Sequence, residues 1–322
     1  MSLPPWLASL PAEDGFIHIS QPRRFAHDEA QYDAQYDNDP DNTSVGRGIV
    51  QLLKDAGADF SAPALEVGCG TGLVSLGMAG ASPYPLTIFT DPSPAFLRIT
   101  QKKVQRHGLT EDRLAYAVLM GEEIDRLPEG QLSLIVLRST LHHVLHVEKF
   151  IRDSARALRS GGVLTFQEPC MEGYILMGAM IQFLPRLAEA AGDTVSPDQH
   201  KRIRLFADTM KYYARRDLDK TKAEDKHLFR VDELMAIGDG CGLAVEFRAN
   251  TAYENFVNPG ARPEPDAFTP FFRNYAKYCM SWDEGLMRLF DRHMLPSCAY
   301  VEECSRGGSG PYLHGVFICR KR

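Results

Sequence analysis

The sequence predicts an α/β fold in which helices cover both faces of a doubly wound, mostly parallel sheet of seven strands. Short apolar runs alternate with stretches of helical spacing, and a glycine-rich turn directly follows the first of these runs. Alternation of this kind builds β-α-β units, whose strands are parallel and buried on both faces. The same rhythm returns near the end of the chain, after a long helical interruption.

Seven short segments have the length and the apolar character of buried strands. They are 64–68, 86–90, 114–119, 132–137, 163–166, 243–249 and 315–319. Between them, helical spacing occupies about 94–107 and 147–159, and the first of these helices ends at His107-Gly108, a typical C-terminal stop. We therefore expect the strands to be joined by helical crossovers rather than by hairpins.

Composition sets the broad class of protein. The 322 residues carry a formal net charge of −6, which argues against a broad nucleic-acid-binding face. The seven cysteines form no C-x-x-C pair, and no apolar stretch approaches the length that spans a membrane. With no basic, apolar leader at the start, we expect a cytoplasmic enzyme with reduced thiols and without a membrane or nucleic-acid partner.

The glycine-rich turn reads Glu66-x-Gly68-x-Gly70-x-Gly72, at the point where a strand should give way to a helix. Glycine allows a tight turn and a close approach of the backbone to a ligand. A dinucleotide-binding turn would need its third glycine one position later, where Leu73 stands. Glu66 would repel a phosphate but suits a ligand that carries an ammonium group.

Residues 65–72 resemble the first motif of the class I S-adenosylmethionine-dependent methyltransferases almost letter for letter. The resemblance implies that S-adenosylmethionine is the cofactor and that this turn holds its methionyl and ribose parts. A second element, 90–93, resembles the acidic element of the same family at the end of the second strand. Cofactor contacts are thereby expected from Glu66, Gly68, Cys69, Gly70, Gly72, Asp91, Pro92 and Ser93, with Asp91 binding the ribose hydroxyls.

Further elements of the family extend the resemblance over about 64–168, and loosely over 228–249. Gly121-Glu122-Glu123 resembles the element whose acid recognises the adenine amino group. Glu122 stands in the position of that acid, Glu123 is the alternative, and a solvated acidic turn remains open. Arg138 is expected to line the cofactor pocket. Tyr36 lies in a segment similar to the N-terminal helix that many members fold over the cofactor, although packing of that helix explains it equally well.

Methyl transfer needs a base only if the accepting atom must lose a proton. His142 and His143 follow the fourth strand, in a stretch that resembles the family's LHHV element, and Glu168 ends the fifth strand. These three are the candidate catalytic residues. A structural role for either histidine, and an anchoring role for Glu168, remain open, and no cluster of acidic residues predicts a metal.

The chain is expected to divide into four parts. Residues 1–60 form an N-terminal helical cover segment, 61–170 the cofactor-binding half, 171–230 a helical substrate-lid insertion, and 231–322 the rest of the sheet with a second helical insertion at about 266–304. Both insertions could instead mediate a homodimer. Methionine and aromatic residues between 171 and 213 indicate either an adaptable apolar pocket or the core of the insertion.

The leading hypothesis is a methyltransferase that acts on a small-molecule acceptor, possibly at oxygen. One alternative is a protein or RNA methyltransferase that uses the basic residues of 201–204 and 215–226 as a docking face. Another is a non-catalytic partner subunit that retains the fold.

Overall fold

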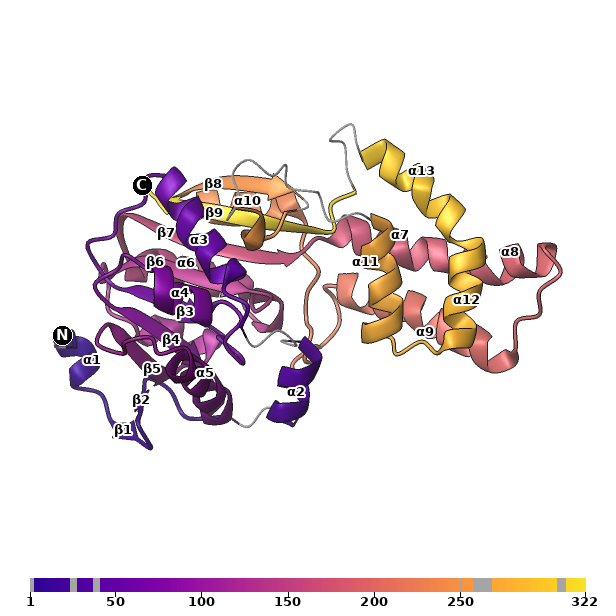
Figure 1. Ribbon diagram of the computed structural model, residues 1–322. Coiled ribbons are helices and arrows are strands. Elements are labelled where there is room, and N and C mark those ends of the chain that lie inside the picture. The colour runs from indigo at the N-terminus through magenta and orange to yellow at the C-terminus, as the bar shows by residue number, and fades with distance from the viewer. Residues whose placement is uncertain (1–2, 24–27, 37–40, 250, 257–267, 306–310) are drawn as a thin grey trace.

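The structure is a computed structural model that describes residues 3–23, 28–36, 41–249, 251–256, 268–305 and 311–322. Over these residues the strands form one nine-stranded sheet in the order β1-β2-β5-β4-β3-β6-β7-β9-β8 (Figure 1). The strands are β1 Ala12–Glu13, β2 Phe16–His18, β3 Ala64–Val67, β4 Thr87–Asp91, β5 Leu114–Val118, β6 Leu132–Arg138, β7 Leu158–Pro169, β8 Leu243–Ala249 and β9 His314–Lys321.

The centre of the sheet is parallel, as the alternation of strands and helices predicts. β5, β4, β3, β6 and β7 run in one direction, whereas β9 lies antiparallel between β7 and β8. The strand order reverses at β3, because β4 follows on one side and β6 on the other. The carboxyl ends of β3, β4 and β6 therefore meet at one edge of the sheet, the place where open α/β sheets bind ligands.

The seven expected strands are all present, but the described residues hold two more, β1 and β2. Both lie in the part of the chain that was expected to be a purely helical cover. β2 pairs with the outer side of β5 in parallel, and β1 pairs with β2 in antiparallel fashion. Strands of two and three residues are too short to produce a recognisable alternation of apolar and polar residues, so the sequence did not reveal them.

Helices cover both faces of the sheet and bury its side chains in two separate cores. Leu65 and Ile88 face the core beneath α6 and α10, whereas Ala64 and Phe89 face the core beneath α3, α4 and α5. This alternation is the period of two that a strand imposes on its side chains. The covering helices are α3 Ser44–Asp55, α4 Ser75–Ala81, α5 Pro94–Arg106, α6 Val147–Ala157, α10 Val231–Gly240 and the short α1 Pro5–Ala8.

The two insertions pack together into one helical unit, which extends to one side of the sheet beyond β7 and β9 (Figure 1). Its own apolar core joins both insertions, for example through Phe206 and Phe272, whose ring centroids lie 5.6 Å apart. Tyr174, Met177 and Met210 belong to this core, which decides their role in favour of packing. The unit comprises α7 Met171–Met180, a short turn Ile181–Phe183, α8 Leu184–Ala190, α9 Pro197–Ala214, α11 Phe268–Asn274, a π-helical turn Tyr275–Cys279, α12 Glu284–His293 and α13 Leu295–Ser305.

None of the helices in the described part of the chain combines the length and the apolar character that crossing a bilayer requires.

Candidate active site

The glycine turn follows β3 directly. Three of its residues have backbone angles in the left-handed region. Gly68, Gly70 and Gly72 have φ values of +72°, +52° and +101°, which other L-residues adopt only at a cost. A Cβ on Gly68 would lie 2.5 Å from the Thr140 methyl group, whereas a Cβ on Gly70 would meet nothing within 4 Å. Gly68 thus allows contact with the residues that follow β6, and Gly70 leaves open space beside the turn.

Asp91 connects this turn to the end of β4. Its carboxylate accepts hydrogen bonds from the amide of Gly70 at 3.0 Å and from the amide of Ser93 at 2.8 Å. The Ser93 hydroxyl in turn caps α5 by accepting from the amide of Phe96. Burial raises the pKa of Asp91 to about 7. A buried carboxylate of this kind is stabilised by donors that a ligand brings to it.

Glu66 lies on β3, two residues before Gly68, and its side chain is buried. The Ser75 hydroxyl donates to its carboxylate at 2.6 Å, and burial raises the pKa of Glu66 to about 8. Two buried carboxylates and an open glycine turn form a site that a cation would stabilise, because a positive charge offsets the cost of ionising them. The ammonium group of S-adenosylmethionine would supply this positive charge, and its ribose hydroxyls would donate hydrogen bonds to a carboxylate. The residues therefore fit the cofactor.

The buried Asp91 carboxylate makes the stability of the ligand-free protein depend on pH. Its pKa is raised in the folded state, so the folded protein binds more protons than the unfolded chain between about pH 4 and pH 7, and stability falls as pH rises through that window. Asp91→Asn removes the cost of ionising this buried carboxyl group. Chemical unfolding should show equal stabilities near pH 4 and an advantage of a few kcal/mol for Asp91→Asn at pH 8. If the free energies of unfolding of wild type and Asp91→Asn differed by the same amount at every pH, Asp91 would not have a raised pKa in the folded protein.

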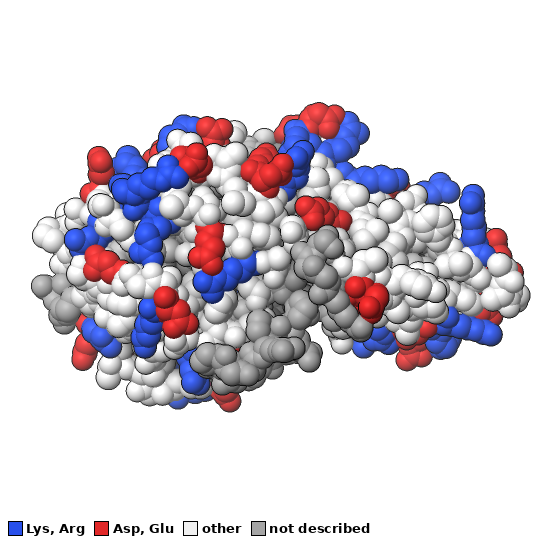
Figure 2. Space-filling model, turned by 90° about the horizontal axis from the view of Figure 1, so that it is seen from above, with Lys and Arg blue, Asp and Glu red and all other residues white. Residues whose placement is uncertain are grey.

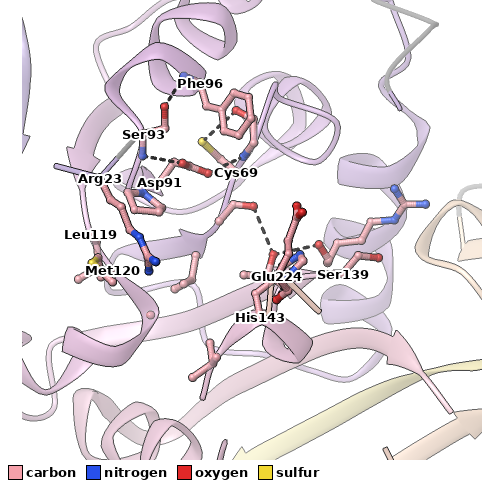
Figure 3. A pocket seen from close by; sticks show the side chains of 18 of the residues that line it. Arg23, Cys69, Asp91, Ser93, Phe96, Leu119, Met120, Ser139, His143 and Glu224 are labelled. Carbon is pink, nitrogen blue, oxygen red and sulfur yellow. Dashed lines mark hydrogen bonds between the residues drawn. The ribbon is translucent and has the colours of Figure 1, made fainter. Parts of the chain in front are cut away.

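A cavity of about 460 Å³ lies along the carboxyl edge of the sheet. Figure 3 shows Cys69, Asp91 and Ser93 on one side of it and Ser139, His143 and Glu224 across from them. Of the residues expected at the cofactor, those that line the cavity are Glu66, Gly68, Cys69, Gly70, Asp91, Pro92, Ser93, Gly121, Glu122 and Arg138.

Three residues expected at the cofactor are not among those that line the cavity. Gly72 packs towards Thr100, whose hydroxyl would lie 3.2 Å from an added Cβ. Glu123 pairs with Arg126 at 2.7 Å, on the other side of the short helix that holds Glu122. The side chain of Tyr36 lies outside the described part of the structure. One helical turn earlier, Tyr32 lines the cavity.

Glu122 and Arg138 are held in place from outside the cavity. Glu122 accepts a hydrogen bond from the amide of Leu145 at 3.2 Å, which joins the turn after β5 to the turn after β6. The Arg138 guanidinium donates to the Gln167 side chain at 3.2 Å. Both side chains therefore reach the cavity in defined orientations.

The three catalytic candidates form one network, and only one of them lines the cavity. Glu168 is fully buried and accepts from the amides of Thr140 and Leu141 and from Nδ1 of His142, at 2.6 to 2.8 Å. His142 lies between the carboxylates of Glu168 and Asp225. Burial disfavours a charged imidazole, but the two carboxylates outweigh it and raise the pKa of His142 to about 10. His142 is therefore already protonated at neutral pH, and neither it nor Glu168 is among the described residues that line the cavity.

His143 lines the cavity and is neutral at pH 7. Burial and the charge on His142 lower the pKa of His143 to about 4. Its Nδ1 lies 3.0 Å from the backbone oxygen of Glu224 and 3.4 Å from the Asp225 carboxylate. Both partners come from the chain between α9 and α10, which no motif had marked.

Residues 219–226, which we call the lid segment, form part of the cavity wall. Thr221, Lys222, Ala223, Glu224 and Lys226 line the cavity, whereas no residue from α7 to α9 is among the described residues that do. Within the insertion 171–230 that was expected to form a lid, the described residues that line the cavity thus belong to this short segment and not to α7, α8 or α9. In the sequence the lid segment is only a charged run, whose basic residues suggested a docking face for RNA or protein and not the wall of a small-molecule cavity.

Two buried lysines hold the lid segment together. The ammonium of Lys220 donates to the backbone oxygen of Lys226 at 2.8 Å, and that of Lys226 donates to two carbonyls of the segment's own backbone. The amide of Lys226 also donates to the backbone oxygen of His142 at 2.9 Å. The lid segment is thus anchored directly on the turn that carries the two histidines.

Comparisons with known proteins agree with this architecture. Residues 65–166 match the family described as "Methyltransferase domain". The chain is 32% identical over 126 residues to the reducing polyketide synthase Preu2 of Preussia isomera, covering 36% of this chain and 5% of that protein. It is 32% identical over 128 residues to the thiol S-methyltransferase TMT1B of Homo sapiens, covering 38% of this chain and 49% of that one. The chain thus spans about half the length of the human relative and a small part of the fungal one.

A solved structure from Galdieria sulphuraria, described as a sarcosine dimethylglycine methyltransferase, has the same fold. It superposes with a TM-score of 0.54 at 12% identity and covers 91% of this chain and 97% of its own.

The strand order and the glycine turn, together with the match over residues 65–166, are those of a class I, S-adenosylmethionine-dependent methyltransferase domain. The helical unit lies outside the matched residues.

Proposed function

We propose that the protein transfers a methyl group from S-adenosylmethionine to a small molecule that carries a thiol or hydroxyl group. The observation that carries this proposal is the cavity, which joins the acidic glycine turn to His143 and is closed on one side by the lid segment. Its volume of about 460 Å³ lies within the range of small-molecule sites, roughly 300 to 1,000 Å³.

The cofactor supplies an activated methyl group on a sulfonium centre, and the protein contributes orientation and exclusion of water. Asp91 and Glu66 set the position of the bound cofactor from one side of the cavity. The lid segment covers the other side, where His143 lies. A thiol or hydroxyl acceptor must lose its proton as it attacks, and His143 is the residue placed to assist that loss.

The similarity to a thiol S-methyltransferase favours a thiol among the possible acceptors. That match covers 38% of this chain, so most of the chain has no counterpart in it. An oxygen-directed reaction remains the alternative within the same proposal, because both acceptors present a proton to be lost next to His143.

The charges of the basic segments argue against an RNA- or protein-docking face. Lys220 and Lys226 are buried, Arg216 pairs with Glu233, and Arg202 pairs with Asp283. On the face shown in Figure 2, acidic and basic side chains are interspersed rather than gathered by sign. Such a surface produces little of the sequence-independent attraction on which nucleic-acid binding depends.

A homodimer through the helical unit stays a prediction. Phe183 and Leu205, both on the helical unit, are 57% and 58% exposed, and apolar side chains of this kind favour association when they gather on one surface. Light scattering on the purified protein at several concentrations measures the mass directly.

A screen with methyl-labelled cofactor tests the proposed function. The protein is incubated with a panel of small thiols and matched alcohols and phenols, and products are analysed by mass spectrometry for a labelled methyl group. We expect methylated products in the small-molecule fraction. Label that appears only in added protein or RNA, or in no product at all, would contradict the proposal.

A further inference from the structure

The turn after β6 and the lid segment bring three potential metal ligands together. His142 and His143 come from the short helix Leu141–His143, and Asp225 comes from the lid segment. One donor atom from each lies within 4.8 Å of the others. Asp225 Oδ1 is 3.5 Å from His142 Nε2 and 3.4 Å from His143 Nδ1. Tetrahedral bonds of about 2.0 to 2.1 Å to nitrogen and oxygen would place neighbouring ligand atoms at comparable separations.

We propose that His142, His143 and Asp225 form a binding site for a divalent transition metal such as zinc. Two imidazoles and one carboxylate are a donor set suited to zinc and its first-row neighbours, and less so to magnesium or calcium. Three protein ligands leave a position open, which is the arrangement of catalytic rather than structural zinc sites.

Glu168 supports this assignment, because it contacts the nitrogen of His142 that does not face Asp225. Its buried carboxylate lies 2.6 Å from Nδ1 of His142 and accepts the proton there. Nε2 of His142 faces Asp225, and a metal bound there would replace the proton that Nε2 carries in the metal-free protein. Metal-binding imidazoles are almost always oriented in this way, by a carboxylate or carbonyl on their other nitrogen.

The backbone oxygen of Glu224 lies on the same side of the cluster. It is 3.0 Å from Nδ1 of His143, so it is close enough to complete the coordination or to hold a bound water. Because His143 and Glu224 both line the cavity, the open position faces the space where an acceptor would lie.

The metal site rests on the proposed function and specifies how His143 assists the acceptor. A thiol or hydroxyl bound to the metal loses its proton to solvent, because coordination lowers its pKa. The freed electron pair on sulfur or oxygen forms the bond to the methyl carbon. The bond between that carbon and the sulfonium sulfur breaks, and its electron pair stays on the sulfur. His143 acts in this reaction as a ligand, and no further base is needed.

Metal binding is measured on the full-length protein after dialysis against a chelator. Titration with zinc, followed by elemental analysis of the desalted protein, should give about one ion per chain. Titration with cobalt should produce the visible absorption of a low-coordinate site. Asp225→Ala should weaken binding by at least about 100-fold, whereas Glu168→Gln should weaken it by about 10- to 100-fold. Asp217→Asn, on an exposed neighbour of the lid segment that pairs with Arg215, is the matched control and should bind as the wild type does.

Binding of S-adenosylhomocysteine separates failure of this inference from failure of the proposed function. Asp225→Ala should retain that binding, because Asp225 is not among the described residues that line the cavity. Wild-type protein that binds the cofactor product but takes up no zinc or cobalt would overturn the metal site alone. Equal metal uptake by wild type and Asp225→Ala would overturn it as well.

Discussion

Asp91→Ala is expected to weaken binding of S-adenosylmethionine by about 100-fold or more. We expect the carboxylate to accept hydrogen bonds from the two ribose hydroxyls, and bonds to a charged group contribute about 1.5 to 3 kcal/mol each. The substitution also removes the acceptor of the Gly70 and Ser93 amides, so the glycine turn loses one of its connections to β4, while the bond from the Cys69 amide to the Thr90 carbonyl stays. Calorimetry with the cofactor gives the change in Kd directly.

The sequence alone suggests that this variant keeps its fold, because Asp91-Pro92 resembles a loop. In the structure Asp91 ends β4 and is 5% exposed, so alanine would leave the amides of Gly70 and Ser93 without this acceptor. Asp91→Asn is therefore the better control, since it preserves an acceptor while removing the charge. If Asp91→Asn and Asp91→Ala both bound the cofactor like the wild type, Asp91 would have no role in binding the ribose.

His143→Ala is expected to lower kcat by about 10²- to 10⁴-fold, the range for loss of a group that assists proton removal. The affinity for S-adenosylmethionine should change little, because His143 lies across the cavity from Asp91 (Figure 3). Steady-state kinetics with the acceptor found in the labelled screen, together with calorimetry, separates the two effects.

A matched control is His146→Ala, three residues along the same turn and not among the residues that line the cavity. This variant should keep kcat near that of the wild type. A His143→Ala variant with unchanged kcat would remove His143 from the reaction. A parallel loss of cofactor affinity would instead indicate a structural role.

The cofactor half of the site could be predicted because its determinants are local in sequence. The glycines of 68–72 and the acid at position 91 each follow a buried strand directly, and parallel strands bring their carboxyl ends to one edge. Glu122 could be placed by the same reasoning. Glu123 could not be separated from it, because the two acids are adjacent in sequence and only the fold of the short 3₁₀ helix Gly121–Arg126 directs Glu122 to the cavity and Glu123 to Arg126.

The part of the site where the acceptor would bind could not be predicted, because it depends on a contact between segments that are distant in sequence. Asp225 meets the two histidines only after the chain has passed through α7, α8 and α9. Charged residues in a run usually form a solvated surface, and the burial of Lys220 and Lys226 has no local pattern. For the same reason no metal ligands could be recognised from the sequence.

Calorimetric titration of the full-length protein with S-adenosylmethionine and S-adenosylhomocysteine tests the central claim most directly. We expect saturable binding of one molecule per chain for both ligands, and a marked loss of affinity in Asp91→Ala. The absence of binding at millimolar concentrations of either ligand would contradict the assignment of the cavity to this cofactor.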